Sequence, residues 1–311
     1  MPMNITVLLV AAFISGFIAP LIQKLFLNYK KHDVINHRSS HSVVATRTGG
    51  IVSFTVIFIL SFYYYLNGIE VYDYSLLIPL STMFIVGVYD DFYNADFKLK
   101  FFMQIIVAKM LIDQGLVIDN FYGVLGLEEI PRIFSQLFTV FVFLVIINSI
   151  NFIDGVDGLA ITEVIKVLIV FIYFLPIDSS LIFLGTITIG SLLPLYYYNY
   201  RKEKKIFLGD GGSLFLGTLV SIYIFNFLND DFYFSLNKAV VSILVVLYPL
   251  VDLLRVFIIR IHKRKSPFQP DNSHLHHILL KKNIKHWKIG IILPIFFLII
   301  SYLLIIILKS F

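Results

Sequence analysis

Long apolar runs alternate with short polar connections along nearly the whole chain. About ten of these runs approach the roughly 20 residues that an α-helix needs to cross a bilayer. Within lipid, a segment must satisfy its backbone hydrogen bonds internally, so each run is expected to be a helix. The runs cover residues 3–27, 49–66, 74–89, 101–118, 133–147, 159–175, 181–198, 213–228, 239–259 and 289–308.

This pattern predicts an all-α polytopic membrane protein in which residues 1–311 form one integral membrane domain. With 58% hydrophobic residues, the chain is far too apolar for a soluble domain. It contains no cysteine, which excludes thiol catalysis, cysteine-ligated metals and disulfides.

Lys and Arg gather in the connections that lead from odd- to even-numbered runs. The first holds Lys30, Lys31, Arg38 and Arg47, and the connections before the eighth and tenth runs hold further clusters. Basic loops stay in the cytoplasm, so this side is expected to be cytoplasmic, and an even number of helices places both termini outside.

A polar island, residues 148–160, separates the fifth and sixth runs. Asn148, Asn151, Asp154 and Asp157 recur in it at steps of three. Carboxylates at a membrane boundary are costly unless they bind something, and hard oxygen ligands suit Mg²⁺ or sugar and base hydroxyls. The simpler alternative is a solvated loop in which Asp caps a helix.

Asp90 and Asp91 end the third run, on the same predicted face as the island. Adjacent carboxylates can share a metal or raise one another's pKa, and Lys98 and Lys100 follow closely. Acids and lysines together suit a phosphate with a divalent cation. A helix end with two solvated acids is the simpler alternative.

Two further polar segments lie on this face. Asp210 stands among glycines before an apolar run, where exposed backbone N–H groups could bind an anion and the carboxylate a bridging Mg²⁺; a helix cap is the alternative. His274, His276 and His277 follow in the last basic loop. These three could hold zinc, hold a diphosphate, or belong to an ordinary polar loop.

Several motifs, taken together and in order, resemble one enzyme family. The chain resembles the polyprenyl-phosphate N-acetylaminosugar-1-phosphate transferases (glycosyltransferase family 4), most closely the WecA/TagO-like branch, which is related to MraY. Asn199 and Asn272 stand where the spacing or the residue departs from the usual pattern. The motifs are Asp33 to Gly50 with Arg38, His41 and Arg47; Asp90-Asp91 through Lys98 and Lys100 to Gln104; 148–160; 199–217; and Asp252, Arg255 and Arg260 through His277.

The resemblance implies transfer of an N-acetylaminosugar 1-phosphate, best taken as GlcNAc-1-phosphate, from a UDP-sugar to undecaprenyl phosphate, with release of UMP. Asp90 is then the candidate base, Asp91 positions it or the metal, and Asp210 with Asn151 holds Mg²⁺, for which Mn²⁺ could substitute. The implied substrate-binding residues are Asn148, Asp154, Asp157, Lys98, Lys100, Asn199, Arg260, His274, His276 and His277.

The implied setting is the bacterial cytoplasmic membrane, at the start of a cell-surface polysaccharide. The partners are then the nucleotide sugar, the polyprenyl phosphate and the lipid bilayer, with no nucleic acid and with a homodimer left open. UDP-GalNAc, UDP-QuiNAc and UDP-FucNAc remain alternative donors, as does MraY-like phospho-MurNAc-pentapeptide transfer. A transporter is a distant alternative, because transport sites lie near the bilayer midplane, often between repeated halves, and no repeat is visible here.

Overall fold

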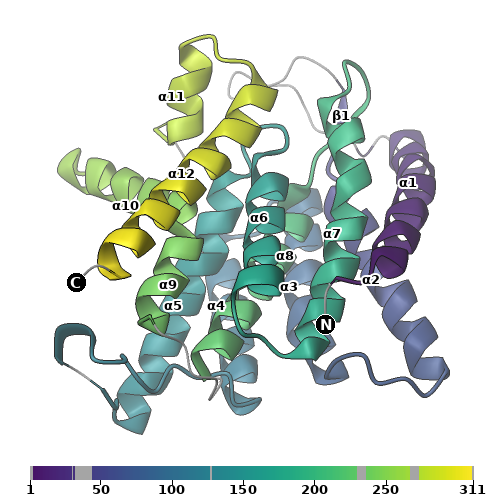
Figure 1. Cartoon of the computed structure of the whole chain (residues 1–311). Helices are drawn as coiled ribbons and strands as arrows, with labels where there is room; N and C mark the ends of the chain where they lie inside the picture. The colour runs from purple at the N-terminus through teal and green to yellow at the C-terminus, as the bar shows by residue number, and fades with distance from the viewer. Residues whose placement is uncertain are drawn as a thin grey trace.

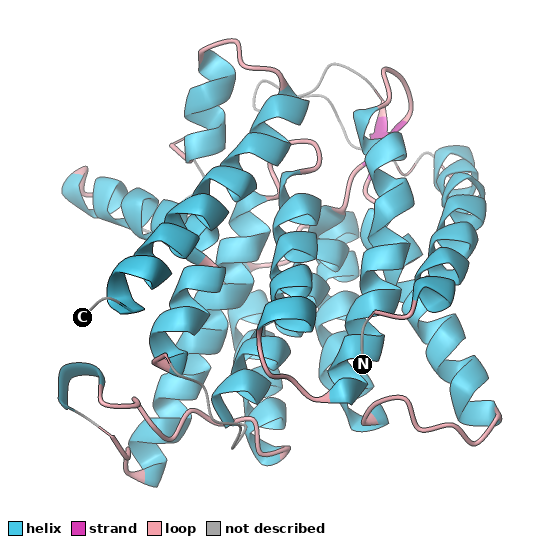
Figure 2. Cartoon of the chain, in the orientation of Figure 1, coloured by secondary structure: helices cyan, strands magenta, loops and turns pink. Residues whose placement is uncertain are grey.

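The computed structural model describes residues 3–29, 31, 44–126, 128–229, 236–266 and 273–309. Asp33, Arg38 and His41 of the first basic connection, and Asp271 and Asn272 of the last, lie outside these ranges. The described residues form a bundle of α-helices with one short strand pair, which confirms the predicted all-α class (Figures 1 and 2).

The helices follow the predicted apolar runs closely. Two 3₁₀ turns, Tyr74–Leu76 and Val124–Gly126, accompany them. The elements are α1 (Ile5–Asn28), β1 (Ala45–Thr46), α2 (Gly49–Leu66), α3 (Leu77–Tyr93), α4 (Phe97–Asp113), α5 (Arg132–Ile153), α6 (Leu159–Phe174), α7 (Ser179–Tyr200), β2 (Lys205–Ile206), α8 (Gly209–Asn229), α9 (Lys238–Val245), α10 (Leu247–His262), α11 (Leu275–Lys281) and α12 (His286–Lys309).

The ninth apolar run is not one straight span, which corrects the prediction for 239–259. It divides into α9 and α10, which are bent by 77° relative to one another. The break lies at Val246, three residues before Pro249. Proline has no backbone N–H and its ring clashes with the carbonyl four residues earlier, here that of Val245, which favours a kink or break at this point.

Seven described helices are long and apolar enough to cross a membrane singly, and the bent pair could make an eighth span. α4 and α6, with 17 and 16 residues, fall below that length. Even so, the protein is a multi-pass membrane protein by the length and hydropathy of its helices.

α8 forms the centre of the bundle. Of its membrane-length segment 94% is buried, against 22% for α1 and 17% for α12, which lie at the periphery. α3 and α5 pack against α8, and α2 adjoins it as well. The first residues of α8 are therefore surrounded by the ends of other helices.

A short parallel strand pairing brings two distant loops to one end of the bundle. Ala45 pairs with Lys205 and Thr46 with Ile206 (Figure 2). The backbone N–H groups of Gly49 and Gly50 continue the ladder by donating to the carbonyls of residues 207 and 208, at 2.8 Å each.

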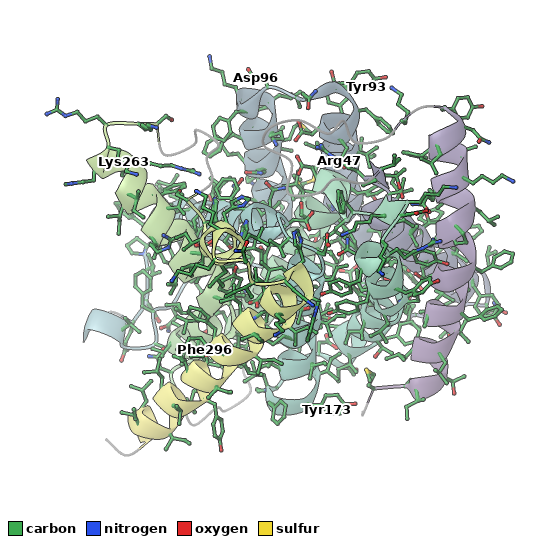
Figure 3. All side chains as sticks on the ribbon, turned by 90° about the horizontal axis from the view of Figure 1, so that it is seen from above. Arg47, Tyr93, Asp96, Tyr173, Lys263 and Phe296 are labelled. Carbon is green, nitrogen blue, oxygen red and sulfur yellow. The ribbon has the colours of Figure 1, made fainter. Side chains whose placement is uncertain are left out.

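The starts of α2 and α8 are thereby held side by side. Figure 1 places α11 near the same end as β1. Seen from that end, Arg47 lies within the outline of the bundle, whereas Lys263, just after α10, lies at its edge (Figure 3).

Candidate active site

Three side chains from three helices meet at the end of α3. The Lys100 Nζ lies 2.5 Å from the Asp90 Oδ2 and 3.4 Å from the Asp210 Oδ2. Asp90 is buried, and Lys100 reaches it from the first turn of α4. Two carboxylates 120 residues apart along the chain thus share one ammonium group.

Asp91 performs a different task from its neighbour. Its Oδ1 accepts from the backbone N–H of Asp210 at 3.0 Å, and its Oδ2 accepts from that of Gly211 at 2.9 Å. A carboxylate here also matches the positive end of the α8 dipole. Arg47 approaches the same carboxylate at 3.5 Å. Asp91 therefore fixes the start of α8, and with it the backbone that carries Asp210.

Glycines allow this contact to be close. A Cβ atom added to Gly87 of α3 would lie 2.2 Å from the carbonyl oxygen of Asp210, and one added to Gly50 of α2 would lie 2.2 Å from the Gly212 nitrogen. Only glycine lets the three backbones approach so closely. Asp90, Asp91, Asp210, Lys100 and Arg47 are called the carboxylate cluster below.

The polar island contributes two amides to the edge of the cluster. The Asn151 Nδ2 donates to the Asp210 Oδ1 at 2.9 Å and to the Ser213 Oγ at 2.8 Å. One turn earlier on α5, the Asn148 Nδ2 donates to the Gln104 Oε1 at 2.8 Å. Asn151 thus touches Asp210 directly, and Asn148 lies behind it against α4.

Asp154 follows α5 as its C-terminal capping residue. Burial raises its pKa well above the usual range, and the negative charges of Asp210 and Asp91 raise it further, while Arg47 opposes the shift. The Asp154 carboxylate therefore interacts electrostatically with three members of the carboxylate cluster.

Asp157 contacts a lysine and lies near a histidine instead. The Lys205 Nζ of β2 donates to its Oδ2, and the His286 Nδ1 at the start of α12 lies 3.4 Å from the same oxygen. These contacts join the polar island to two other segments of the chain. They give Asp157 a structural role whether or not it also contacts a nucleotide.

Residues 273–277, called the histidine segment, lead into α11 beside the island. The rings of His274 and His276 are nearly parallel, with centroids 5.4 Å apart, and the His277 ring lies 4.3 Å from that of His276. His276 is fully buried, and a Cβ on Gly155 of the island would lie 2.7 Å from its Nε2. The sequence-predicted histidines and island are thus in contact.

His276 is neutral at physiological pH. Burial, together with the neighbouring His277 and His274, lowers the pKa of its imidazole to about 3. Both ring nitrogens lack a hydrogen-bond partner within the described part of the chain. His276 can therefore serve as a neutral donor or acceptor, but not as a cation for a diphosphate.

Two predicted site residues, Lys98 and Asn199, lie outside this constellation. Lys98 is exposed on α4 and forms no ion pair with the carboxylates among the residues that the structure describes. Asn199 donates from its amide to the carbonyl of Ile206 at 2.8 Å, so it holds the turn before β2. Arg260, at the end of α10, is buried.

Several side chains at the site were not among the predicted site residues. Arg47, Gln104, Lys205 and Ser213 lie within the family motifs or basic loops of the sequence but carried no predicted role at the site. Arg47 and Ser213 adjoin Gly-rich segments in the sequence, which is the one signal that could have pointed to them.

The donor set suits a magnesium ion. Mg²⁺ is usually held by one or two carboxylates, with water and substrate phosphates completing its shell. Asp90 and Asp210 already direct one oxygen each at the same cation, the Lys100 ammonium. No preformed group of three or more His, Asp or Glu ligands occurs among the residues described. A magnesium ion would therefore take two carboxylate oxygens here and the rest from solvent and substrate.

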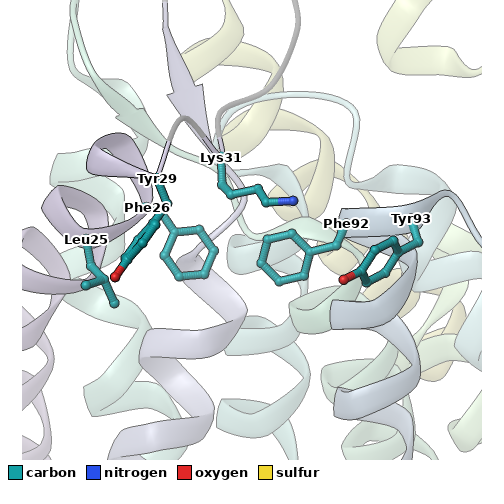
Figure 4. A pocket seen from close by; sticks show the side chains of 6 residues that line it. All are labelled: Leu25, Phe26, Tyr29, Lys31, Phe92 and Tyr93. Carbon is teal, nitrogen blue, oxygen red and sulfur yellow. The ribbon is translucent and has the colours of Figure 1, made fainter.

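A separate cleft of about 360 Å³ lies between the ends of α1 and α3 (Figure 4). The Lys31 Nζ lies 5.2 Å from the centre of the Phe92 ring and 5.8 Å from that of Tyr93. Among the residues described around it, the lining contains no carboxylate. The cleft is thus chemically distinct from the carboxylate cluster.

The chain is similar to several named transferases over most of its length. It is 30% identical over 291 residues to the probable undecaprenyl-phosphate N-acetylglucosaminyl 1-phosphate transferase of Bacillus subtilis (strain 168), covering 89% of this chain and 79% of that protein. It is 31% identical over 300 residues to the undecaprenyl-phosphate alpha-N-acetylglucosaminyl 1-phosphate transferase of Pasteurella multocida (strain Pm70), covering 91% and 80%.

A third relative, the decaprenyl-phosphate N-acetylglucosaminephosphotransferase of Mycobacterium leprae (strain TN), is 25% identical over 323 residues, covering 94% and 81%. Residues 74–227, which include Asp90, Asn151 and Asp210, match Glycosyl transferase family 4. The chain therefore belongs to glycosyl transferase family 4, within the superfamily of polyprenyl-phosphate N-acetylaminosugar-1-phosphate transferases.

Proposed function

We propose that this enzyme transfers GlcNAc-1-phosphate from UDP-GlcNAc to undecaprenyl phosphate and releases UMP. The names of its relatives support the sugar and the lipid. The observation that carries the proposal is the Lys100 ammonium between Asp90 and Asp210, because it combines a positive charge for phosphate with oxygens for a metal.

The reaction exchanges one phosphoanhydride bond for another. A phosphate oxygen of the lipid attacks the phosphorus that carries the sugar, a new P–O–P bond forms, and the bond to UMP breaks with its electron pair staying on UMP. In-line phosphoryl transfer of this kind depends mainly on positioning and on charge stabilisation. The protein must therefore bring two anions together and neutralise them.

Each part of the site has a role in this scheme. Asp90 accepts a proton from the lipid phosphate where that group arrives protonated, and Lys100 neutralises phosphate charge. Asp91 holds the start of α8 in place. The polar island and the histidine segment then face the nucleotide and the sugar.

Asp210, with Asp90 beside it, would hold Mg²⁺, and Asn151 would orient Asp210. The ion, when bound, neutralises charge on the diphosphate as UMP leaves. The Asn151 amide contributes by restraining the Asp210 Oδ1, while Lys100 lies beside the Oδ2.

The proposed setting places this end of the bundle in the cytoplasm and both termini outside. The Lys and Arg residues of the connecting loops support that orientation. A lipid-linked diphosphosugar made there would initiate a cell-surface polysaccharide.

Purified protein in detergent, with Mg²⁺ and undecaprenyl phosphate, tests the proposal. UDP-GlcNAc, UDP-GalNAc, UDP-QuiNAc and UDP-FucNAc are offered separately, and UMP release and the lipid product are followed. Turnover with UDP-GlcNAc that EDTA abolishes is expected. Turnover with a different donor alone would overturn the choice of sugar, and an absence of turnover from folded protein would overturn the reaction.

A further inference from the structure

We propose that Asp252 is a positioning residue that sets the tautomer and place of the His274 ring at the site. The inference rests on the proposed function for its catalytic consequence only. Asp252 lies on α10, beyond the bend, and is completely buried. In the sequence, Asp252 belongs to a family motif and carries no predicted role.

The Asp252 carboxylate collects three donors. The His274 Nδ1 lies 2.9 Å from its Oδ2. The backbone N–H of Leu275 donates to its Oδ1 at 2.8 Å, and the Arg255 guanidinium donates to the same oxygen at 2.9 Å. Both carboxylate oxygens are therefore occupied.

Arg255 also fixes the residue that precedes His274. It donates to the backbone carbonyl of Ser273. Three consecutive residues, 273–275, are thus each fixed by Asp252 or Arg255. Since α11 has only seven residues, it could not hold this geometry alone. The anchor lies on α10, which packs alongside α5, the helix that leads into the polar island.

The held ring is directed at the site. Phe152, beside Asn151 in the island, meets His274 edge to face, with centroids 5.7 Å apart. The second ring in contact with His274 is that of His276, which stacks on it with an interplanar angle of 9°. The ring is therefore bound at its Nδ1 edge and packed against two aromatic neighbours, and this leaves Nε2 as the nitrogen free of Asp252.

The chemistry of the contact defines the role. A carboxylate can only accept, so Asp252 requires a proton on the His274 Nδ1. On a neutral ring the Nε2 is then an acceptor, as a hydroxyl or amide N–H of the aminosugar requires. Asparagine at position 252 would keep one acceptor oxygen for Leu275 and Arg255 and turn its NH₂ toward His274. That places the proton on Nε2 and reverses its polarity.

The first test reads the tautomer directly and does not need turnover. Nitrogen-15 spectra of histidine-labelled protein in mildly alkaline buffer are compared for the parent and Asp252→Asn, with His274→Gln assigning the signal. Parent His274 is expected to carry its proton on Nδ1, and the variant on Nε2. An unchanged Nδ1–H signal in folded Asp252→Asn would overturn the proposal.

Glu163→Gln is the matched control. Glu163 is also a fully buried acid with a cation three residues along its helix, Lys166 at 2.5 Å. It has no hydrogen bond to the histidine segment in the described structure. This variant is expected to leave the His274 signal and the turnover per folded molecule unchanged, which separates loss of a buried charge from loss of the His274 contact.

Kinetics supply the second test. Asp252→Asn is expected to lower kcat/KM for the UDP-sugar about 10- to 100-fold, as removal of an orienting partner commonly does. In a His274→Gln background, the same change should have no further effect. An undiminished loss in that background would mean that Asp252 serves the fold only.

A second variant covers the case in which Asp252→Asn does not fold. Arg255→Gln removes the donor to Ser273 but leaves the Asp252–His274 contact. It is expected to retain the Nδ1–H signal and to lower kcat/KM several-fold. Full activity would contradict the proposal that Asp252 and Arg255 together hold the histidine segment in place. Failure of the proposed function would show differently, because the parent would then release no UMP while the tautomer test would still give its result.

Discussion

The carboxylate cluster and the histidine segment are built by opposite means. The cluster lies where α3, α2 and α8 touch through glycine backbones, so main-chain packing fixes Asp90, Asp91 and Asp210. The histidine segment lies beside a seven-residue helix and depends on the side chains of Asp252 and Arg255. The first region is rigid by construction, whereas the second can be displaced by changing one side chain.

The largest effect is expected where chemistry and packing coincide. Asp210→Asn should lower kcat/KM about 1,000-fold, because it removes a charge aimed at the metal and phosphate, while leaving the fold intact. UMP release and thermal unfolding in detergent measure the two effects. Asp113→Asn is the control: Asp113 forms an exposed ion pair with Lys109, and surface pairs of this kind contribute little. Equal activity of Asp210→Asn and the parent would contradict the assignment.

Gly87→Ala tests the backbone contact itself. The new methyl would meet the Asp210 carbonyl at 2.2 Å, and neither backbone can move without shifting a helix. A loss of about 1–3 kcal/mol or more in unfolding free energy is expected, with loss of turnover.

The control for this change is Gly16→Ala in α1. Its nearest neighbouring atom would be 3.8 Å away, an ordinary contact, so stability should be unchanged or gain about 0.5–1 kcal/mol from helix propensity. If the two variants unfolded at the same temperature, the close packing of α3 on α8 would be wrong.

Gly155→Ala is the corresponding change beside the histidine segment. Its methyl would meet a side-chain atom, the His276 Nε2 at 2.7 Å, and a ring can turn aside. The loss of stability should therefore be smaller, about 1 kcal/mol, while KM for the UDP-sugar rises several-fold. In a His276→Ala background the substitution should cost almost nothing, and a double-mutant cycle measures this.

The smallest effect is a pH dependence of stability. His276 is neutral when folded, with a pKa of about 3, and unfolding returns it to its ordinary value of 6.5. The unfolded state therefore binds a proton first as pH falls, and stability should decline below 6.5 by up to about 1.4 kcal/mol per pH unit.

Thermal midpoints between about pH 4.5 and pH 7 measure this slope, which His276→Asn should reduce. His274, His277, Asp252 and Arg255 are the charged or titratable groups that face His276, and they remain in the variant. Identical slopes for parent and variant would show that His276 is not the responsible group.

The sequence predicted most of the helices because their apolar runs are long and their ends are polar. It also placed Asp90, Asp91, Asn151 and Asp210 at one end of the bundle, which the structure confirms by their contacts. These predictions succeed because a membrane forces charged residues to helix ends, so position along the chain specifies depth.

Other features depend on the direction in which a side chain points and not on its depth in the membrane. Lys98 and Lys100 are two residues apart, about 200° around a helix, and only Lys100 reaches the carboxylates. The pairing of Asp157 with Lys205 and that of Asp252 with His274 join residues far apart in the sequence. The bend before Pro249 was not predicted either, because Pro20, Pro194 and Pro294 stand within apolar runs that form single helices.

The bond between Asp91 and the start of α8 also has a consequence for biosynthesis. It joins residues 119 positions apart in the chain. At about 5–20 residues per second, the ribosome needs roughly 6–24 s to make that interval. For that time α3 is complete while the Asp91 carboxylate lacks the two backbone donors of α8. Asp91 stands near the end of its helix, where water can solvate it, so the nascent protein can wait for α8 without burying an unpaired charge.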